Sequence, residues 1–130
     1  MTPELTVLAF AGLLQGLQFT FYAIFANLQI GTKKAMGPRD KHITLEGTAG
    51  RMQRAMNNHF EGLIFFSLAV VVVVLGDKTT GFSAICAWTY LCSRILYIPA
   101  YTFGWTPWRS LIWAIGFFAT MLMIVSALLF

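Results

Sequence analysis

GLIFFSLAVVVVVLG, residues 62–76, is a run of 15 uncharged and mostly apolar residues in the middle of the chain. Three more runs without a charged residue occupy 5–32, 79–93 and 110–130. With 58% hydrophobic and 11% charged residues, a chain of 130 residues cannot hide this apolar surface in a water-soluble core. Such runs are typical of transmembrane helices. The sequence therefore predicts an all-α, integral membrane four-helix bundle formed by one domain, residues 1–130.

The expected helices, with approximate bounds, are 3–30, 46–76, 80–101 and 107–130. The pair Thr106 and Pro107 predicts the start of the last one, with Thr106 as N-cap and Pro107 as the first helical residue. In the first helix, the spacing of Gly12 and Gly16 is typical of a contact with another helix. Because Glu4 and no basic residue precedes the first apolar run, we expect a mature helix there and not a cleaved secretory signal.

Basic residues follow the first helix in a cluster and also flank the connection between the third and fourth helices. Lys78 is the single basic residue between the second and third helices. Since connections rich in Lys and Arg stay cytoplasmic, we expect the first and third connections in the cytoplasm and both termini outside. The net charge of +4 does not indicate nucleic-acid binding, because segments of hydrocarbon length separate the basic residues.

Two of the helices must carry a charge into the bilayer. Crossing about 30 Å of hydrocarbon at about 1.5 Å per residue takes about 20 residues. The charge-free runs 62–76 and 79–93 have 15 residues each. Counted from the outer turn, Glu61 and Arg94 reach a similar depth, where opposite charges on neighbouring helices can neutralise each other. We therefore predict an ion pair between Glu61 and Arg94.

The same two helices each carry a polar stripe, because a period of about 100° per residue places their polar side chains on one face. The stripes consist of Arg51, Arg54, Asn58 and Glu61 on the second helix, and of Arg94, Tyr97 and Tyr101 on the third. Facing stripes would form a cationic cleft at the cytoplasmic side, suited to an anionic small molecule, with an entrance from the lipid for an apolar one. Alternatively, these groups only join the helices and satisfy one another.

Arg109 is expected in the first turn of the fourth helix, where the backbone also favours an anion. Lowering the pKa of a thiol from about 8.5 by about two units requires roughly 2.7 kcal/mol, which one arginine and a helix start can supply. The alternative role for Arg109 is that of a cytoplasmic membrane anchor. We expect His59 to have a packing or interface role. Cys86 and Cys92 are expected to be small core residues, and their spacing does not support a metal site. Trp105, Trp108 and Trp113 are expected to form an interfacial aromatic belt.

The segment Arg51-Met-Gln-Arg54-Ala-Met-Asn57-Asn58-His-Phe-Glu61 resembles the R-x-x-R-A-x-x-N-x-x-E signature of the MAPEG superfamily, the membrane-associated proteins in eicosanoid and glutathione metabolism. A second segment, Arg94-Ile-Leu-Tyr97-Ile-Pro-Ala-Tyr101 followed by Trp105-Thr-Pro-Trp-Arg109, resembles the third-helix motif and the fourth-helix arginine of that family. The four-span layout covers the whole chain.

This resemblance implies a homotrimer with active sites between neighbouring subunits and with glutathione as the cofactor. It implies that the tripeptide is held by Arg54, Asn58, Glu61, Tyr97 and Tyr101, with Lys33 in contact and with Arg51 and Arg94 flanking or bracing the site. Arg109 matches the thiolate-activating arginine. The implied reactions are conjugation of the thiolate to a hydrophobic electrophile and reduction of a lipid peroxide.

Gly62 and Met56 stand where some glutathione-binding members have a tyrosine and a glutamine, so we expect Gly62→Tyr to lower the glutathione dissociation constant. Some members of the family regulate other enzymes, which keeps a non-catalytic membrane binding or scaffold protein of the same fold as the alternative function. A small multidrug transporter would need an acidic residue in its first span, and residues 5–32 contain none.

Overall fold

The computed structural model describes residues 1–30, 47–104 and 107–130. Within them it contains four long helices, α1 (Pro3–Ile30), α3 (Gly47–Leu75), α4 (Gly81–Thr102) and α5 (Trp108–Leu129). Each is long and apolar enough to cross a membrane. A helix is suited to this environment because its backbone groups bond to one another where no water is present. The chain is therefore an all-α, multi-pass integral membrane protein.

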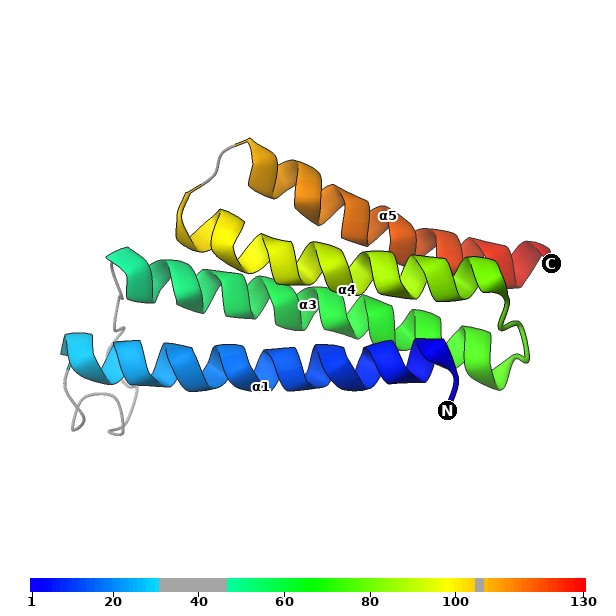
Figure 1. Ribbon diagram of the computed structural model, residues 1–130, viewed down its shortest axis with the longest axis horizontal. Helices are drawn as coiled ribbons and strands as arrows, with labels where there is room; N and C mark the ends of the chain where they lie inside the picture. Colours follow the sequence, from blue (N-terminus) through cyan, green and yellow to red (C-terminus); the bar gives the residue numbers. More distant parts are fainter. Residues whose placement is uncertain (31–46, 105–106) are drawn as a thin grey trace.

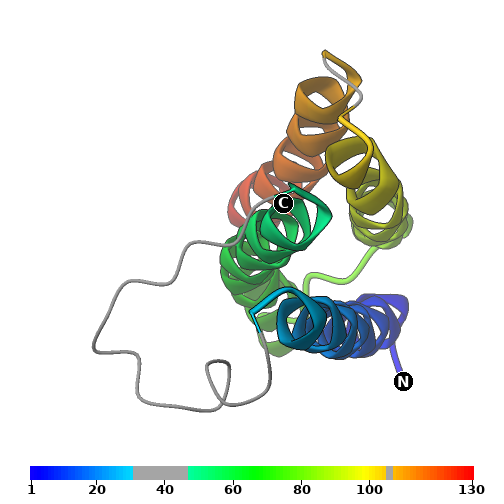
Figure 2. The same ribbon diagram turned by 90° about the vertical axis from the view of Figure 1, so that its left-hand side faces the viewer.

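The helices lie side by side, and the chain reverses direction from each one to the next (Figure 1). Both termini and the connection from α3 to α4 lie at one end of the bundle, and the turn from α4 to α5 lies at the other (Figure 1). Viewed along the bundle (Figure 2), α1 packs against α3 and α4, and α5 packs against the same two helices. Since α1 and α5 share no contact among the described residues, α3 and α4 form the middle of the bundle.

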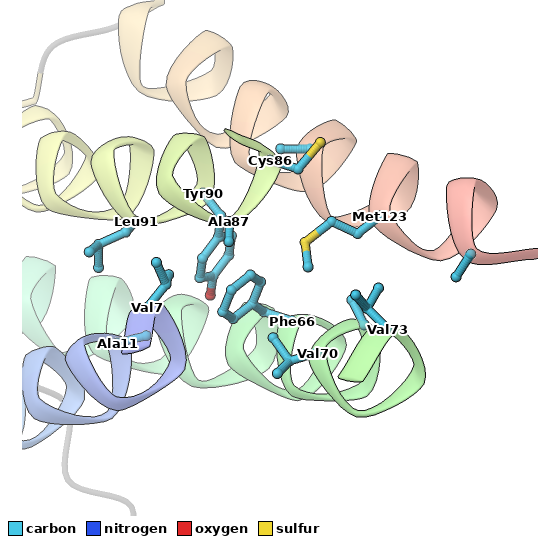
Figure 3. Close-up of a cluster of buried hydrophobic side chains, with 13 residues drawn as sticks. Val7, Ala11, Phe66, Val70, Val73, Cys86, Ala87, Tyr90, Leu91 and Met123 are labelled. Atoms are coloured by element: carbon cyan, nitrogen blue, oxygen red, sulfur yellow. The ribbon is translucent and has the colours of Figure 1, made fainter. Parts of the chain in front are cut away.

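The buried core contains side chains from all four helices (Figure 3). Its largest ring contact is between Phe66 and Tyr90, whose centroids lie 4.1 Å apart with an interplanar angle of 6°. Cys86 is buried, Cys92 is exposed, and both thiols are free. Many large apolar side chains are exposed on the outside of the bundle. In water such a surface would promote association, whereas in a bilayer lipid covers it.

Local sequence sets the bounds of α4 and α5. Thr80 caps α4 through a reciprocal pair of hydrogen bonds with Ser83, 2.8 and 3.2 Å long. Gly104, just after α4, has a φ of 70°, which favours glycine. Pro107, with φ −91° and ψ 4°, is the N-cap of α5, so its expected position as the first helical residue is wrong by one residue. Thr106 lies outside the described residues.

Polar contacts tie α1 to the other helices. His59 is buried, and its Nδ1 lies 2.7 Å from Oε1 of Gln15, which confirms a packing role for this histidine. Near the N-terminus of α1, the Ser83 hydroxyl donates a hydrogen bond to the buried carboxylate of Glu4. The charge pattern does not predict this burial, because a charge so close to a terminus is usually solvated.

The two glycines of α1, Gly12 and Gly16, are exposed. A Cβ placed on either of them would have no neighbouring atom within 4 Å. The helix contact predicted for this pair is therefore not made within the described part of the chain. The reason is the rotation of α1 about its axis, which directs Gln15 towards α3 and leaves the glycines on the outer surface.

Candidate functional site

Side chains of both polar stripes meet between α3, α4 and the start of α5. The Nε of Arg54 donates a hydrogen bond of 3.0 Å to the Tyr101 hydroxyl. The guanidinium carbon of Arg109 lies 5.0 Å from the centroid of the Tyr101 ring, within the range of a cation–π contact. The Tyr97 ring lies next to it, with centroids 5.6 Å apart. Cations from two helices thus surround one phenol of a third, which makes this end of the site positively charged and rich in donors.

Arg94 precedes Tyr101 on α4 by about two helical turns, which is roughly 10 Å along the helix axis at about 1.5 Å per residue. Its guanidinium carbon is 4.6 Å from the centroid of the Tyr97 ring. The residue is only 3% exposed, and its Nε and Nη2 have no hydrogen-bond partner. A buried guanidinium with two unpaired nitrogens is a strong potential donor to an anion, because a desolvated charge without a partner is costly.

A cavity of about 90 Å³ adjoins Arg94. It is lined by Asn58, Glu61, Gly62, Phe65, Tyr90, Arg94, Trp113, Phe117 and Thr120. Since a single water needs roughly 10–15 Å³, the cavity has room for several waters or for one small polar group. Asn58 and Glu61 of the α3 stripe and Arg94 of the α4 stripe therefore border a common space.

The predicted ion pair between Glu61 and Arg94 is wrong. Both residues line the cavity, yet no salt bridge joins them in the described part of the chain, and two Arg94 nitrogens have no partner. Glu61 is exposed, whereas Arg94 is buried beside the Tyr97 ring. Equal depth along two helices is necessary for such a pair, but the rotation of each helix decides whether the charged groups meet.

Five of the described residues predicted for the site do not line this cavity: Arg51, Arg54, Tyr97, Tyr101 and Arg109. Arg51 is exposed, and its Nη1 lies 4.0 Å from the position that a Cβ on Gly104 would take. It therefore lies at the rim of the site, near the turn between α4 and α5. Lys33 falls outside the described residues, so its contribution stays a prediction.

Four aromatic residues of the cavity are absent from the predicted site: Phe65, Tyr90, Trp113 and Phe117. Trp113 stacks on Phe117, with centroids 5.2 Å apart and an interplanar angle of 9°. Nothing in the sequence distinguishes Trp113 from an interfacial anchor. Tyr90 precedes Arg94 by four positions, and this helical spacing does predict a shared face.

A model of the MAPEG family matches residues 7–129. The chain belongs to the MAPEG family. Comparisons with curated proteins and with solved structures find no match. This MAPEG protein is thus of the membrane-bound kind associated with glutathione and eicosanoid metabolism, and the family generally uses glutathione. Both motifs that carry the resemblance, the α3 signature and the arginine of α5, meet at Tyr101 in the structure.

Proposed function

We propose that this MAPEG protein is a glutathione-dependent transferase or peroxidase acting on hydrophobic electrophiles within the membrane. The observation that carries this proposal is the position of Arg54 and Arg109, which contact the same tyrosine from different helices. Two guanidinium groups and a phenol at the start of α5 offer charge and hydrogen bonds to a thiolate.

Arg109 is the residue that we assign to thiolate stabilisation. At neutral pH a thiol with a pKa of about 8.5 is mostly protonated, and lowering that pKa by about two units takes roughly 2.7 kcal/mol. A guanidinium and the positive end of the α5 dipole together supply energy of this order. In conjugation the thiolate would form a carbon–sulfur bond as the electrophile loses its leaving group or opens a ring or double bond. With a lipid hydroperoxide it would take the outer oxygen, which breaks the oxygen–oxygen bond and gives the lipid alcohol and a sulfenic acid.

The remainder of the tripeptide is proposed to occupy the cleft between α3 and α4, against Arg54, Asn58, Glu61, Arg94, Tyr97 and Tyr101. Support comes from the polar atoms in the cleft that have no partner, namely Nε and Nη2 of Arg94 and Oδ1 of Asn58. A ligand with several donors and acceptors would satisfy them.

We also propose that the protein, a single MAPEG-like domain of residues 1–130, forms a homotrimer with its sites between neighbouring subunits. Arg54 and Glu61 support this assembly, because both are exposed on a membrane-spanning helix of the single chain. Charged groups in contact with lipid are costly, whereas a second subunit would cover them. On this proposal the first and third connections are cytoplasmic, the termini lie outside, and Lys33 and Arg51 border the site.

The test is a titration of the detergent-solubilised protein with glutathione, following the ultraviolet absorbance of the bound thiolate. We expect a thiolate band that Arg109→Ala abolishes, and a conjugation rate about 100-fold lower in that variant. The control is Lys78→Ala, which removes a cation at the opposite end of the bundle, where it bonds the carbonyl of Phe130. Glutathione binding without any thiolate band would instead favour the non-catalytic alternative.

A further inference from the structure

Tyr90 and Arg94 line the same cavity, and both side chains carry buried polar atoms without a partner. Their side chains are 2% and 3% exposed, and the Tyr90 hydroxyl is unpaired, as are Nε and Nη2 of Arg94. Buried polar groups in folded proteins nearly always have a hydrogen-bond partner, because leaving one unsatisfied costs about 1–3 kcal/mol and more for a charge. The two side chains therefore keep hydrogen-bonding capacity that the described residues do not satisfy.

Both side chains are held in position by aromatic contacts. The Tyr90 ring lies flat against Phe66 in the core (Figure 3). The Arg94 guanidinium lies over the Tyr97 ring. As the two residues are four positions apart on α4, they project from one face of the helix.

Gly62 leaves open the space to which these two groups point. A Cβ on Gly62 would lie 3.6 Å from the Tyr90 hydroxyl and 4.0 Å from Nη1 of Arg94. The hydroxyl and the guanidinium therefore converge on one point of α3, where there is no side chain. A larger residue at this position would enter the cavity and compete with whatever binds there.

We propose that Tyr90 and Arg94 form a carboxylate-binding site beside Gly62. The guanidinium can bind both carboxylate oxygens at once, and the phenol can donate a further hydrogen bond. One buried cation matches a single negative charge. Glu61 also lines the cavity, but its side chain is exposed to solvent, whereas that of Arg94 is buried.

The site deepens the proposed function and rests on it, because it specifies which chemical group occupies the inner end of the cleft. The carboxylate is either one of those of glutathione or that of an amphiphilic co-substrate such as a long-chain fatty acid. The wall of Phe65, Trp113 and Phe117 suits a carbon chain attached to it. This site also reverses the expected effect of Gly62→Tyr, since a phenol at that position would fill the space and weaken glutathione binding.

The experiment measures the dissociation constants of glutathione, oleate and oleyl alcohol for the solubilised full-length protein by calorimetry. Three variants are compared, Tyr90→Phe, Arg94→Met and Gly62→Ala, with Tyr22→Phe as the matched control. Tyr90→Phe keeps the ring on Phe66, and the methyl of Gly62→Ala meets its neighbours at ordinary contact distances. Tyr22 carries a phenol that accepts a hydrogen bond from Gln53 between α1 and α3, away from the cavity.

We expect Tyr90→Phe and Gly62→Ala each to raise the dissociation constant of the carboxylate ligand about tenfold, and Arg94→Met to raise it more. Tyr22→Phe should leave it unchanged. An effect on glutathione alone assigns the carboxylate to glutathione. An effect on oleate alone assigns it to the co-substrate, and the preference for oleate over oleyl alcohol must then disappear in Arg94→Met.

Unchanged affinities for glutathione and oleate in Tyr90→Phe and Arg94→Met would overturn the proposal and leave a cavity that holds only water. This failure is distinct from failure of the proposed function. The thiolate band and its dependence on Arg109 would persist if only the carboxylate site were wrong.

Discussion

His59 and Gln15 form a polar contact inside the membrane-spanning part of the bundle, between α3 and α1. The histidine is 1% exposed, its Nδ1 contacts Gln15, and its Nε2 has no hydrogen-bond partner among the described residues. In hydrocarbon a buried polar side chain relies on its protein partner for hydrogen bonding, because no water is present to replace a lost partner.

Removing Gln15 alone should therefore destabilise the protein more than removing both partners. We expect Gln15→Leu to lower the free energy of unfolding by about 1–3 kcal/mol, since it leaves His59 buried and unsatisfied. The double variant Gln15→Leu, His59→Leu should recover much of this loss. Unfolding in mixed detergent micelles measures both values, and equal losses in the single and double variants would contradict this account of the contact.

At the scale of the helices, α4 and α5 pack tightly where Gly116 meets Ser93. A Cβ on Gly116 would collide with the Ser93 hydroxyl and would lie 3.3 Å from its Cβ. Small residues at such crossings let two membrane helices pack closely. This packing brings Trp113 and Phe117 of α5 to the cavity beside Arg94.

Gly116→Ala should separate the two helices and destabilise the bundle by about 1–3 kcal/mol, the usual cost of overpacking. Ser93→Ala removes the atom that collides most severely, so the double variant should regain part of the stability. Thermal denaturation of the solubilised protein would reveal this. If Gly116→Ala had the melting temperature of the parent, the close crossing would not contribute to stability.

At the scale of the whole molecule, the surface of the single chain carries features that a lipid-facing surface does not favour. Arg54 and Glu61 are exposed on α3, and Gly12 and Gly16 form an uncovered face of small residues on α1. Exposed charges and small residues on membrane helices are both better explained by contact with another subunit. They agree with the proposed homotrimer.

Gly12→Leu combined with Gly16→Leu should therefore weaken the proposed trimer without unfolding the subunit, because neither glycine has a neighbour within 4 Å among the described residues of the chain. We expect the mass in detergent, measured by light scattering, to shift from trimer towards monomer. Gly81→Leu is the matched control, since that glycine also has no neighbour within 4 Å. An unchanged mass in the double variant would exclude this face from the interface.

The sequence by itself determined the four spans and the residues that share a face of α3 or of α4. The reason is physical: hydrocarbon thickness sets the length of a span, a helix is needed to satisfy its backbone, and the helical period places Arg54 with Asn58 and Arg94 with Tyr97. Only the tertiary structure decided which of these groups meet. Arg54 bonds Tyr101, Arg94 lies over Tyr97 and not against Glu61, and the Tyr90 hydroxyl lies near Gly62. Such contacts depend on the rotation and spacing of whole helices. Small residues distant in the sequence, such as Gly116, determine that spacing.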